Sequence, residues 1–189
     1  MRANSNTVNI EKTPYHHGDL RKALVAEGLR LLAVREVESL SLREVARGVG
    51  VSATSVYRHF PDKEALMTAL ALAGLAQLGA AQRTAAEAAD GEGAFAATGR
   101  AYVRFALANP ALFRLIFASP ALAQARADGT MASEAAAMLA ANAAAAAARD
   151  GGEASLRAVR SWALVHGLAM LMLDGQVPAD EGLIDRVIG

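Results

Sequence analysis

Residues 41–60 decide the fold of the chain, and they read SLREVARGVGVSATSVYRHF. Ser41 and Glu44 match the S-x-x-E capping box that starts a helix. Gly50 falls where a helix ends in a residue with left-handed backbone angles. Ser52 is placed to cap a second helix, which Pro61 closes. This arrangement of caps and turn predicts a helix-turn-helix.

The second of these helices is unusual in how much polar surface it leaves outside. Only Val56 and Phe60 require burial, whereas the remaining side chains of residues 53–59 are small, hydroxylic, aromatic-polar or basic. Small residues let a helix approach base edges closely, and hydroxyl, Tyr and His side chains bind phosphate oxygens. The pattern predicts a helix that reads DNA. The alternative is a helical hairpin whose polar face is simply solvated.

Residues 18–65 resemble the DNA-binding domain of the TetR (tetracycline repressor-like) transcriptional regulators. The matching residues are Leu42, Val45, Ala46, Gly50, Val51, Ser52, Val56, Tyr57, His59, Phe60, Lys63 and Leu66. By this resemblance, the residues that contact the phosphate backbone are Ser41, Thr54, Tyr57, His59 and Lys63, and those that meet base edges are Ala53, Thr54 and Ser55. With Arg43, Ser52 and Arg58 added, these residues form the predicted DNA-binding set.

The C-terminal half carries a second resemblance. Residues 109–117 and 162–167 are similar to the ligand-sensing domain of the WHG-type subgroup of TetR regulators. The candidate ligand-binding residues are the large or polar side chains of this half: Tyr102, Phe105, Phe113, Phe117, Trp162, His166 and Met170. Trp162 and His166 are four residues apart and so share one helix face. The alternative is that these side chains form an ordinary helical core.

Composition predicts an all-α protein with about nine helices. Alanine and leucine dominate, strand-forming residues are sparse, and 53% of the 189 residues are hydrophobic. No uninterrupted run of 18 apolar residues is present, so we expect no membrane partner. The absence of cysteine excludes disulfides, thiolate metal sites and cysteine nucleophiles. We expect a flexible segment at 1–17, a DNA-binding domain at 18–65 and a ligand-binding and dimerisation domain at 66–189.

Charge alone does not indicate a DNA-binding protein. Residues 1–65 contain ten Lys and Arg against eight Asp and Glu, a net +2, and residues 66–189 contain nine against eleven, a net −2. The sequence also lacks a G-x-S-x-G motif, a phosphate-binding loop and a G-x-G-x-x-G motif, and its four histidines show no metal-ligand spacing. We therefore expect no enzyme activity, no metal and no cofactor.

These observations and the resemblance together predict a homodimeric, cytoplasmic repressor. It would bind a palindromic operator in double-stranded DNA and be released by a small hydrophobic ligand. The helices expected at about 131–149 and 153–173 are the predicted dimer surface, where four helices would form a bundle. Two alternatives stay open: a transcriptional activator of the same fold, and a helical adaptor that binds protein rather than DNA.

Overall fold

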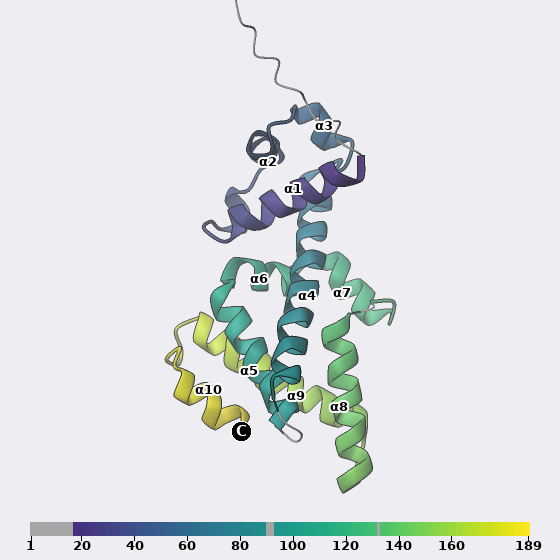
Figure 1. Ribbon diagram of the computed structural model, residues 1–189, viewed down its shortest axis with the longest axis vertical. Helices are drawn as coiled ribbons and strands as arrows, with labels where there is room; N and C mark the ends of the chain where they lie inside the picture. Colours follow the sequence, from purple (N-terminus) through teal and green to yellow (C-terminus); the bar gives the residue numbers. More distant parts are fainter. Residues whose placement is uncertain (1–16, 90–92, 132) are drawn as a thin grey trace, which may run out of the picture.

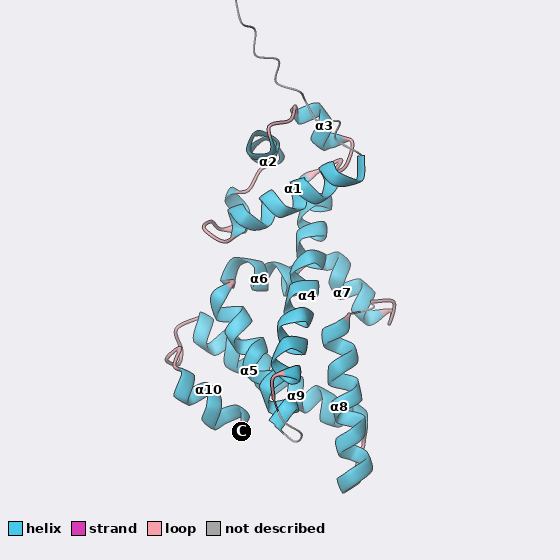
Figure 2. Cartoon of the chain, in the orientation of Figure 1, coloured by secondary structure: helices cyan, strands magenta, loops and turns pink. Residues whose placement is uncertain are grey.

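The computed structural model describes residues 17–89, 93–131 and 133–189. These residues form ten α-helices and one short 3-10 helix, with no strand among them (Figure 2). The all-α prediction is confirmed. The additional helix is α10 (Glu181–Ile188), where the sequence predicted only a turn or two. Most of the predicted flexible N-terminal segment, residues 1–16, lies outside the described residues.

Three helices gather at one end of the molecule, shown at the top of Figure 1: α1 (His17–Leu32), α2 (Leu42–Val49) and α3 (Ala53–Tyr57). The helix α1 begins at His17, the last residue of the segment that was expected to be flexible. The 3-10 helix η1 (Val37–Ser39) links α1 to α2. Leu24, Val45 and Val56, one from each α-helix, are fully buried and form the centre of this end.

The helix α4 (Lys63–Glu87) joins this end to the rest of the molecule (Figure 1). Its 25 residues span about 37 Å at 1.5 Å per residue. Leu66 and Leu70 are fully buried near its beginning, and Leu78 is 1% exposed farther along. A Cβ added at Gly74 would lie 2.7 Å from Cδ1 of Leu112, so α6 (Pro110–Ala118) packs directly on the backbone of α4.

The remaining helices surround the second half of α4. They are α5 (Gly93–Ala108), α7 (Pro120–Ala127), α8 (Glu134–Asp150), α9 (Ala154–Leu173) and α10. In Figure 1, α8 and α10 lie on opposite sides of α4 and α5. Arg104 of α5 forms an ion pair with Glu181 of α10 at 2.7 Å, and a Cβ added at Gly99 would lie 2.9 Å from Ile188. The last helix is therefore closely attached to α5.

The sequence predicts Asn109 as the cap of a helix starting at Pro110, and α6 does start there, whereas α8 starts later than predicted. Asn109 occupies the N-cap position of α6, but its side-chain amide donates to the carbonyl of Phe105 at 3.1 Å and makes no cap hydrogen bond. The helix α8 begins at Glu134 rather than at residue 131, because Ser133 accepts the cap hydrogen bond from Ala136 N and the Met131 N–H closes the end of α7 on the Ala125 carbonyl.

Two helices, α4 and α9, are long and apolar enough to cross a membrane by length and composition. Their most apolar 18-residue windows have mean hydropathies of 1.4 and 1.2. The two helices use this apolar surface differently, because 44% of the α4 window is buried against only 17% of the α9 window. The apolar residues of α4 belong to the core, whereas much of α9 is left uncovered within one chain.

Candidate DNA-reading surface and ligand cavity

The turn between α2 and α3 follows the predicted capping scheme. Ser41 Oγ accepts from Glu44 N at 3.3 Å, and Gly50 has the left-handed angles φ 76° and ψ 29°. Ser52 Oγ accepts from Ser55 N at 3.2 Å and caps α3. The capping box is only half formed, because the Glu44 carboxylate pairs with Arg35 and not with the Ser41 N–H. Arg35 is a contact that the local sequence pattern did not reveal.

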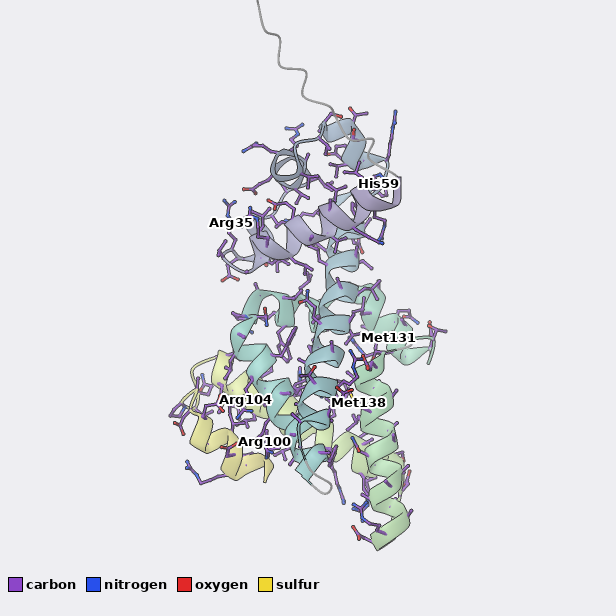
Figure 3. The ribbon with its side chains drawn as sticks, in the orientation of Figure 1. Arg35, His59, Arg100, Arg104, Met131 and Met138 are labelled. Carbon is purple, nitrogen blue, oxygen red and sulfur yellow. The ribbon has the colours of Figure 1, made fainter. Side chains whose placement is uncertain are left out.

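The structure places the predicted DNA-binding residues on one end of the molecule, on and around α2 and α3. The exposed members of the set are Ser41, Arg43, Ser52, Thr54, Tyr57, Arg58 and Lys63, and the partly buried ones are Ala53, Ser55 and His59. Arg58 and His59 lie just beyond α3, which ends at Tyr57 because the N–H groups of His59 and Phe60 both bond to the Val56 carbonyl. Figure 3 shows His59 at this end of the molecule.

Two members of the set already have partners inside the chain. The hydroxyl of Ser55 lies 2.9 Å from that of Ser52, so it supports the start of α3. The Lys63 ammonium donates to the Glu38 carbonyl at 2.9 Å and ties α4 to η1. An ammonium has three donors, so Lys63 retains hydrogen atoms for another acceptor. Thr54 and Tyr57 are the exposed hydroxyls of α3.

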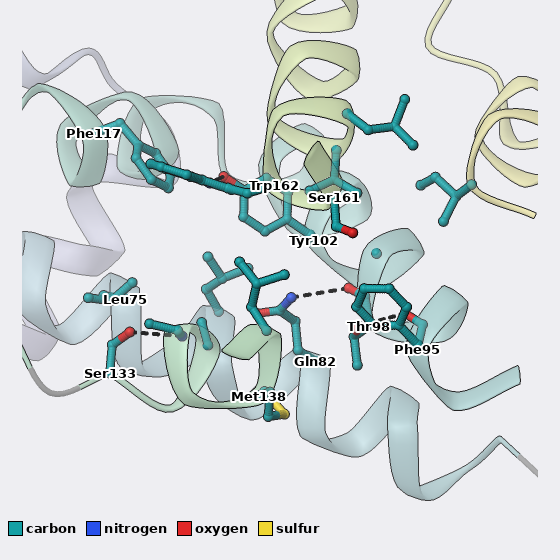
Figure 4. Close-up of a pocket in the computed structure, with 18 of the residues that line it drawn as sticks. Leu75, Gln82, Phe95, Thr98, Tyr102, Phe117, Ser133, Met138, Ser161 and Trp162 are labelled. Carbon is teal, nitrogen blue, oxygen red and sulfur yellow. Dashed lines mark hydrogen bonds between the residues drawn. The ribbon is translucent and has the colours of Figure 1, made fainter. Parts of the chain in front are cut away.

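A cavity of about 420 Å³ lies in the second half of the molecule (Figure 4). Its walls come from seven helices, α4 to α10, together with the segment between α7 and α8. Leu75 and Leu78 of α4, Phe95 of α5 and Met138 of α8 supply apolar surface. The volume is in the range of sites that bind drug-sized molecules.

The seven residues predicted to bind a ligand separate into two groups. Tyr102, Phe117 and Trp162 line the cavity, whereas Phe105, Phe113, His166 and Met170 do not. Phe113 is fully buried and Phe105 is 8% exposed, so both belong to the core. His166 lies behind Tyr102, and its ring centre is 4.7 Å from that of Phe117. Phe113 and His166 contact the wall residues Tyr102 and Phe117.

Tyr102, Trp162 and His166 form a hydrogen-bonded chain. The Trp162 indole N–H donates to the Tyr102 hydroxyl oxygen at 3.4 Å, and that hydroxyl lies 2.8 Å from Nδ1 of His166. Because indole only donates, the Tyr102 hydrogen is available for Nδ1, which then accepts as the unprotonated nitrogen of a neutral ring. Burial, and next the charge of Arg126, lower the pKa of His166, in agreement with a neutral ring. Burial also raises the pKa of Tyr102 above its usual range.

The sequence analysis missed five polar residues that line the cavity: Gln82, Thr98, Arg126, Ser133 and Ser161. Gln82 of α4 donates through its amide nitrogen to the Thr98 carbonyl at 3.2 Å, and Arg126 of α7 lies over the Phe117 ring with its guanidinium carbon 5.5 Å from the ring centre. Each occupies a buried helix face, since Gln82 is four residues after Leu78 and Arg126 four residues after Leu122. A polar residue continuing an apolar stripe was the available sequence signal.

Family models match both parts of this arrangement. Residues 24–70 match the model for bacterial regulatory proteins of the tetR family, and residues 95–188 match the model for the tetracyclin repressor-like C-terminal domain. The chain belongs to the TetR family. Members of this family are DNA-binding transcription regulators rather than enzymes.

Solved structures of TetR-type proteins show the same fold. The regulatory protein SCO4313 is 24% identical with a TM-score of 0.67, and 93% of this chain and 97% of that chain are covered. A TetR family transcription regulator from Marinobacter aquaeolei VT8 is 20% identical with a TM-score of 0.60, covering 89% and 91%. NalD of Pseudomonas aeruginosa is 18% identical with a TM-score of 0.60, covering 92% and 94%.

Proposed function

We propose that this TetR family protein is a homodimeric repressor that binds a palindromic operator. A small molecule bound in the cavity lowers its affinity for that operator. The observation that carries the proposal is the course of α4. This helix begins at Lys63, beside the candidate reading helix α3, and lines the cavity with Leu75, Leu78 and Gln82. A ligand that displaces the cavity half of α4 would therefore also displace the reading end.

Specific recognition supports the dimer. The recognition helix α3 has only five residues, so a single chain contacts few base pairs. A dimer doubles the site and places the two recognition helices about 34 Å apart on a palindrome. NalD is the secondary repressor of a multidrug efflux pump, which favours repression for a chain of the same fold.

The exposed face of α9 supports a dimer surface on α8 and α9. Five of the nine large hydrophobic side chains that are exposed among the described residues lie on α9. Trp162 and Leu164 also line the cavity, which leaves Leu156, Val159 and Leu171 for contact with a second copy. Val159 is 59% exposed within one chain. Burying such side chains between two copies would stabilise the pair by roughly 25 cal/mol per Å² of apolar surface.

The dimer proposal is tested by placing a charge on that face. Val159→Asp should convert the protein to a monomer in sedimentation velocity, because an unpaired carboxylate in an apolar interface is strongly unfavourable. Leu72→Asp on α4 is the matched control, since Leu72 is also an exposed aliphatic residue, at 50% exposure, and does not lie on α9. A Val159→Asp protein that stays dimeric would place the interface elsewhere.

The operator is identified by incubating the purified protein with randomised duplex DNA and sequencing the duplexes that it retains. Enrichment of a palindrome is the expected result, and a promoter carrying it should be less active in cells that make the protein. Retained DNA with no common sequence would contradict sequence-specific reading. Higher promoter activity with the protein present would identify an activator instead.

Ligand release sets a quantitative requirement. A molecule shifts the equilibrium only by the difference between its affinities for the two states, and useful switches have a coupling of about 1–3 kcal/mol. A ligand that binds the cavity should therefore weaken operator binding by at least about fivefold. Cavity binding with unchanged operator affinity would contradict the gating step while leaving DNA recognition intact.

A further inference from the structure

Two polar atoms in the cavity wall are left without a hydrogen-bond partner. Among the described residues, the buried side-chain atoms that lack a partner are Oε1 of Gln82 and Nη1 of Arg126. Both residues line the same cavity, although they belong to α4 and α7. Native proteins pair nearly all buried polar groups, so two such atoms on residues of one cavity wall require an explanation.

Gln82 presents an acceptor in a fixed direction. Gln82 is only 8% exposed, and its amide nitrogen donates a hydrogen bond to the Thr98 carbonyl at 3.2 Å (Figure 4). Because the nitrogen is committed to the protein, the carbonyl oxygen of the same amide is the atom left over. It is complementary to an N–H or O–H donor on a bound molecule.

Arg126 presents a cation without an acidic partner. No ion pair in the described part of the chain includes it, whereas Arg83, Arg100, Arg104 and Arg114 each pair with a carboxylate. The Phe117 ring lies against the guanidinium and holds it in place. A guanidinium stays charged at all ordinary pH values, and its planar fork matches a carboxylate or a similar anionic group.

We propose that the cavity binds an organic acid with a hydrophobic body, its anionic group on Arg126 and an N–H or O–H donor on Gln82. This inference rests on the proposed function, since it names the chemical class of the effector for that site. Leu75, Leu78, Phe95 and Met138 surround the space that the body would fill. Such an acid differs from a purely hydrophobic ligand in carrying one negative charge and one hydrogen-bond donor.

The test uses two dyes that differ by the anionic group alone. Anilinonaphthalene sulfonate and phenylnaphthylamine share the same ring system and one N–H, but only the first carries a negative charge. Both brighten in apolar surroundings, so a fluorescence titration of the full-length protein without DNA gives each affinity. The sulfonate should bind the wild-type protein more tightly than the neutral dye.

Arg126→Met keeps the apolar stem and removes the charge. It should lower the affinity for the sulfonate by about tenfold or more, because charge-assisted hydrogen bonds are the stronger class. The affinity for the neutral dye should stay within about twofold of the wild-type value. Arg126→Lys should restore part of the sulfonate affinity. Gln82→Leu should lower the affinity for both dyes, since both carry the N–H that Gln82 would accept. Arg186→Met removes an exposed charge on α10, away from the cavity lining and the proposed dimer surface, and should leave the affinity for both dyes unchanged.

Several results would overturn the proposal. An equal loss of affinity for both dyes in Arg126→Met would assign Arg126 a structural role. Tighter binding of the neutral dye to the wild-type protein would assign the cavity to uncharged ligands. The urea midpoint of each variant shows whether it is folded, and Arg126→Lys provides a second readout where Arg126→Met is not. Because no DNA is present, a failure of ligand-induced release would leave this result standing.

Discussion

The two ends of α4 differ in how their polar groups are satisfied. At the reading end, Ser41, Ser52 and Asp62 each accept a backbone N–H at a helix start, and Lys63 donates to a carbonyl. At the cavity end, Gln82 and Arg126 each retain an unpaired buried atom. The capping groups at the reading end are therefore paired within the chain, whereas the cavity wall keeps two polar atoms without a partner among the described residues.

The largest expected effect comes from truncating a core residue at the reading end. Phe60 is 1% exposed and lies under the guanidinium of Arg21 at 5.0 Å, so Phe60→Ala should lower the free energy of unfolding by about 3–5 kcal/mol. Urea unfolding followed by circular dichroism measures this loss. Leu72→Ala is the control, because truncating a half-exposed side chain should change stability by less than about 0.5 kcal/mol. Equal stability of the two variants would contradict the packing described for this end.

The next effect probes the packing of α6 against α4. Gly74→Ala adds a Cβ at 2.7 Å from Leu112 Cδ1 and 3.0 Å from Ile116 Cδ1, so it should lower stability by about 1–2 kcal/mol. Gly167→Ala in α9 meets no atom of its own chain within 4 Å and should raise stability by up to about 1 kcal/mol through helix propensity. Thermal unfolding of both variants is the measurement. A loss at Gly167 would show that another chain packs against that glycine.

A smaller effect separates the roles of residues on the reading surface. Lys63→Met should weaken operator and random DNA alike, and it should reduce the slope of log K against log salt by about one. Thr54→Val should instead change which operator sequence is preferred, because Thr54 is exposed on α3. Arg186→Met on α10, outside the proposed dimer surface, is the control for charge. Unchanged salt dependence in Lys63→Met would remove this residue from the phosphate contacts.

The smallest effect concerns the cavity wall. The pKa of His166 is lowered in the folded protein by burial and by the charge of Arg126. The unfolded chain, with an ordinary histidine pKa near 6.5, therefore binds more protons as the pH falls, and stability is full above about pH 6.5 and declines below it. His166→Asn, which keeps an acceptor for Tyr102, should lose less stability between pH 7.5 and pH 5.5. A wild-type urea midpoint that rises on acidification, relative to this variant, would contradict the assignment.

The helices were predictable from sequence because their signals are local. Capping residues act on N–H groups three positions away, so Ser41, Ser52 and Ser119 could be recognised without knowledge of the fold. The error at Asn109 has the same origin, since an asparagine side chain also reaches the preceding turn. The start of α8 was predicted three residues too early because the cap at Ser133 was overlooked.

The cavity was only partly predictable because it depends on distant segments. Tyr102, Phe117 and Trp162 were candidates by size and type, and they do line it. Nothing in the sequence separated them from Phe105 and Phe113, which the packing of α5 and α6 turns into the core. Gln82 and Arg126 were overlooked because an unpaired atom is recognisable only when its potential partners are known to be absent around it.

The sharing of α4 has a consequence for how this protein can diversify. The cavity is lined by seven helices, but of these only α4 also begins beside the reading helix. In the proposed ligand-gated repressor, substitutions at Phe95, Arg126 or Met138 would alter the chemical signal without changing a residue of the candidate reading surface. Input and output would then be exchangeable separately, and the chain would be a starting point for biosensors with new inducers and an unchanged promoter.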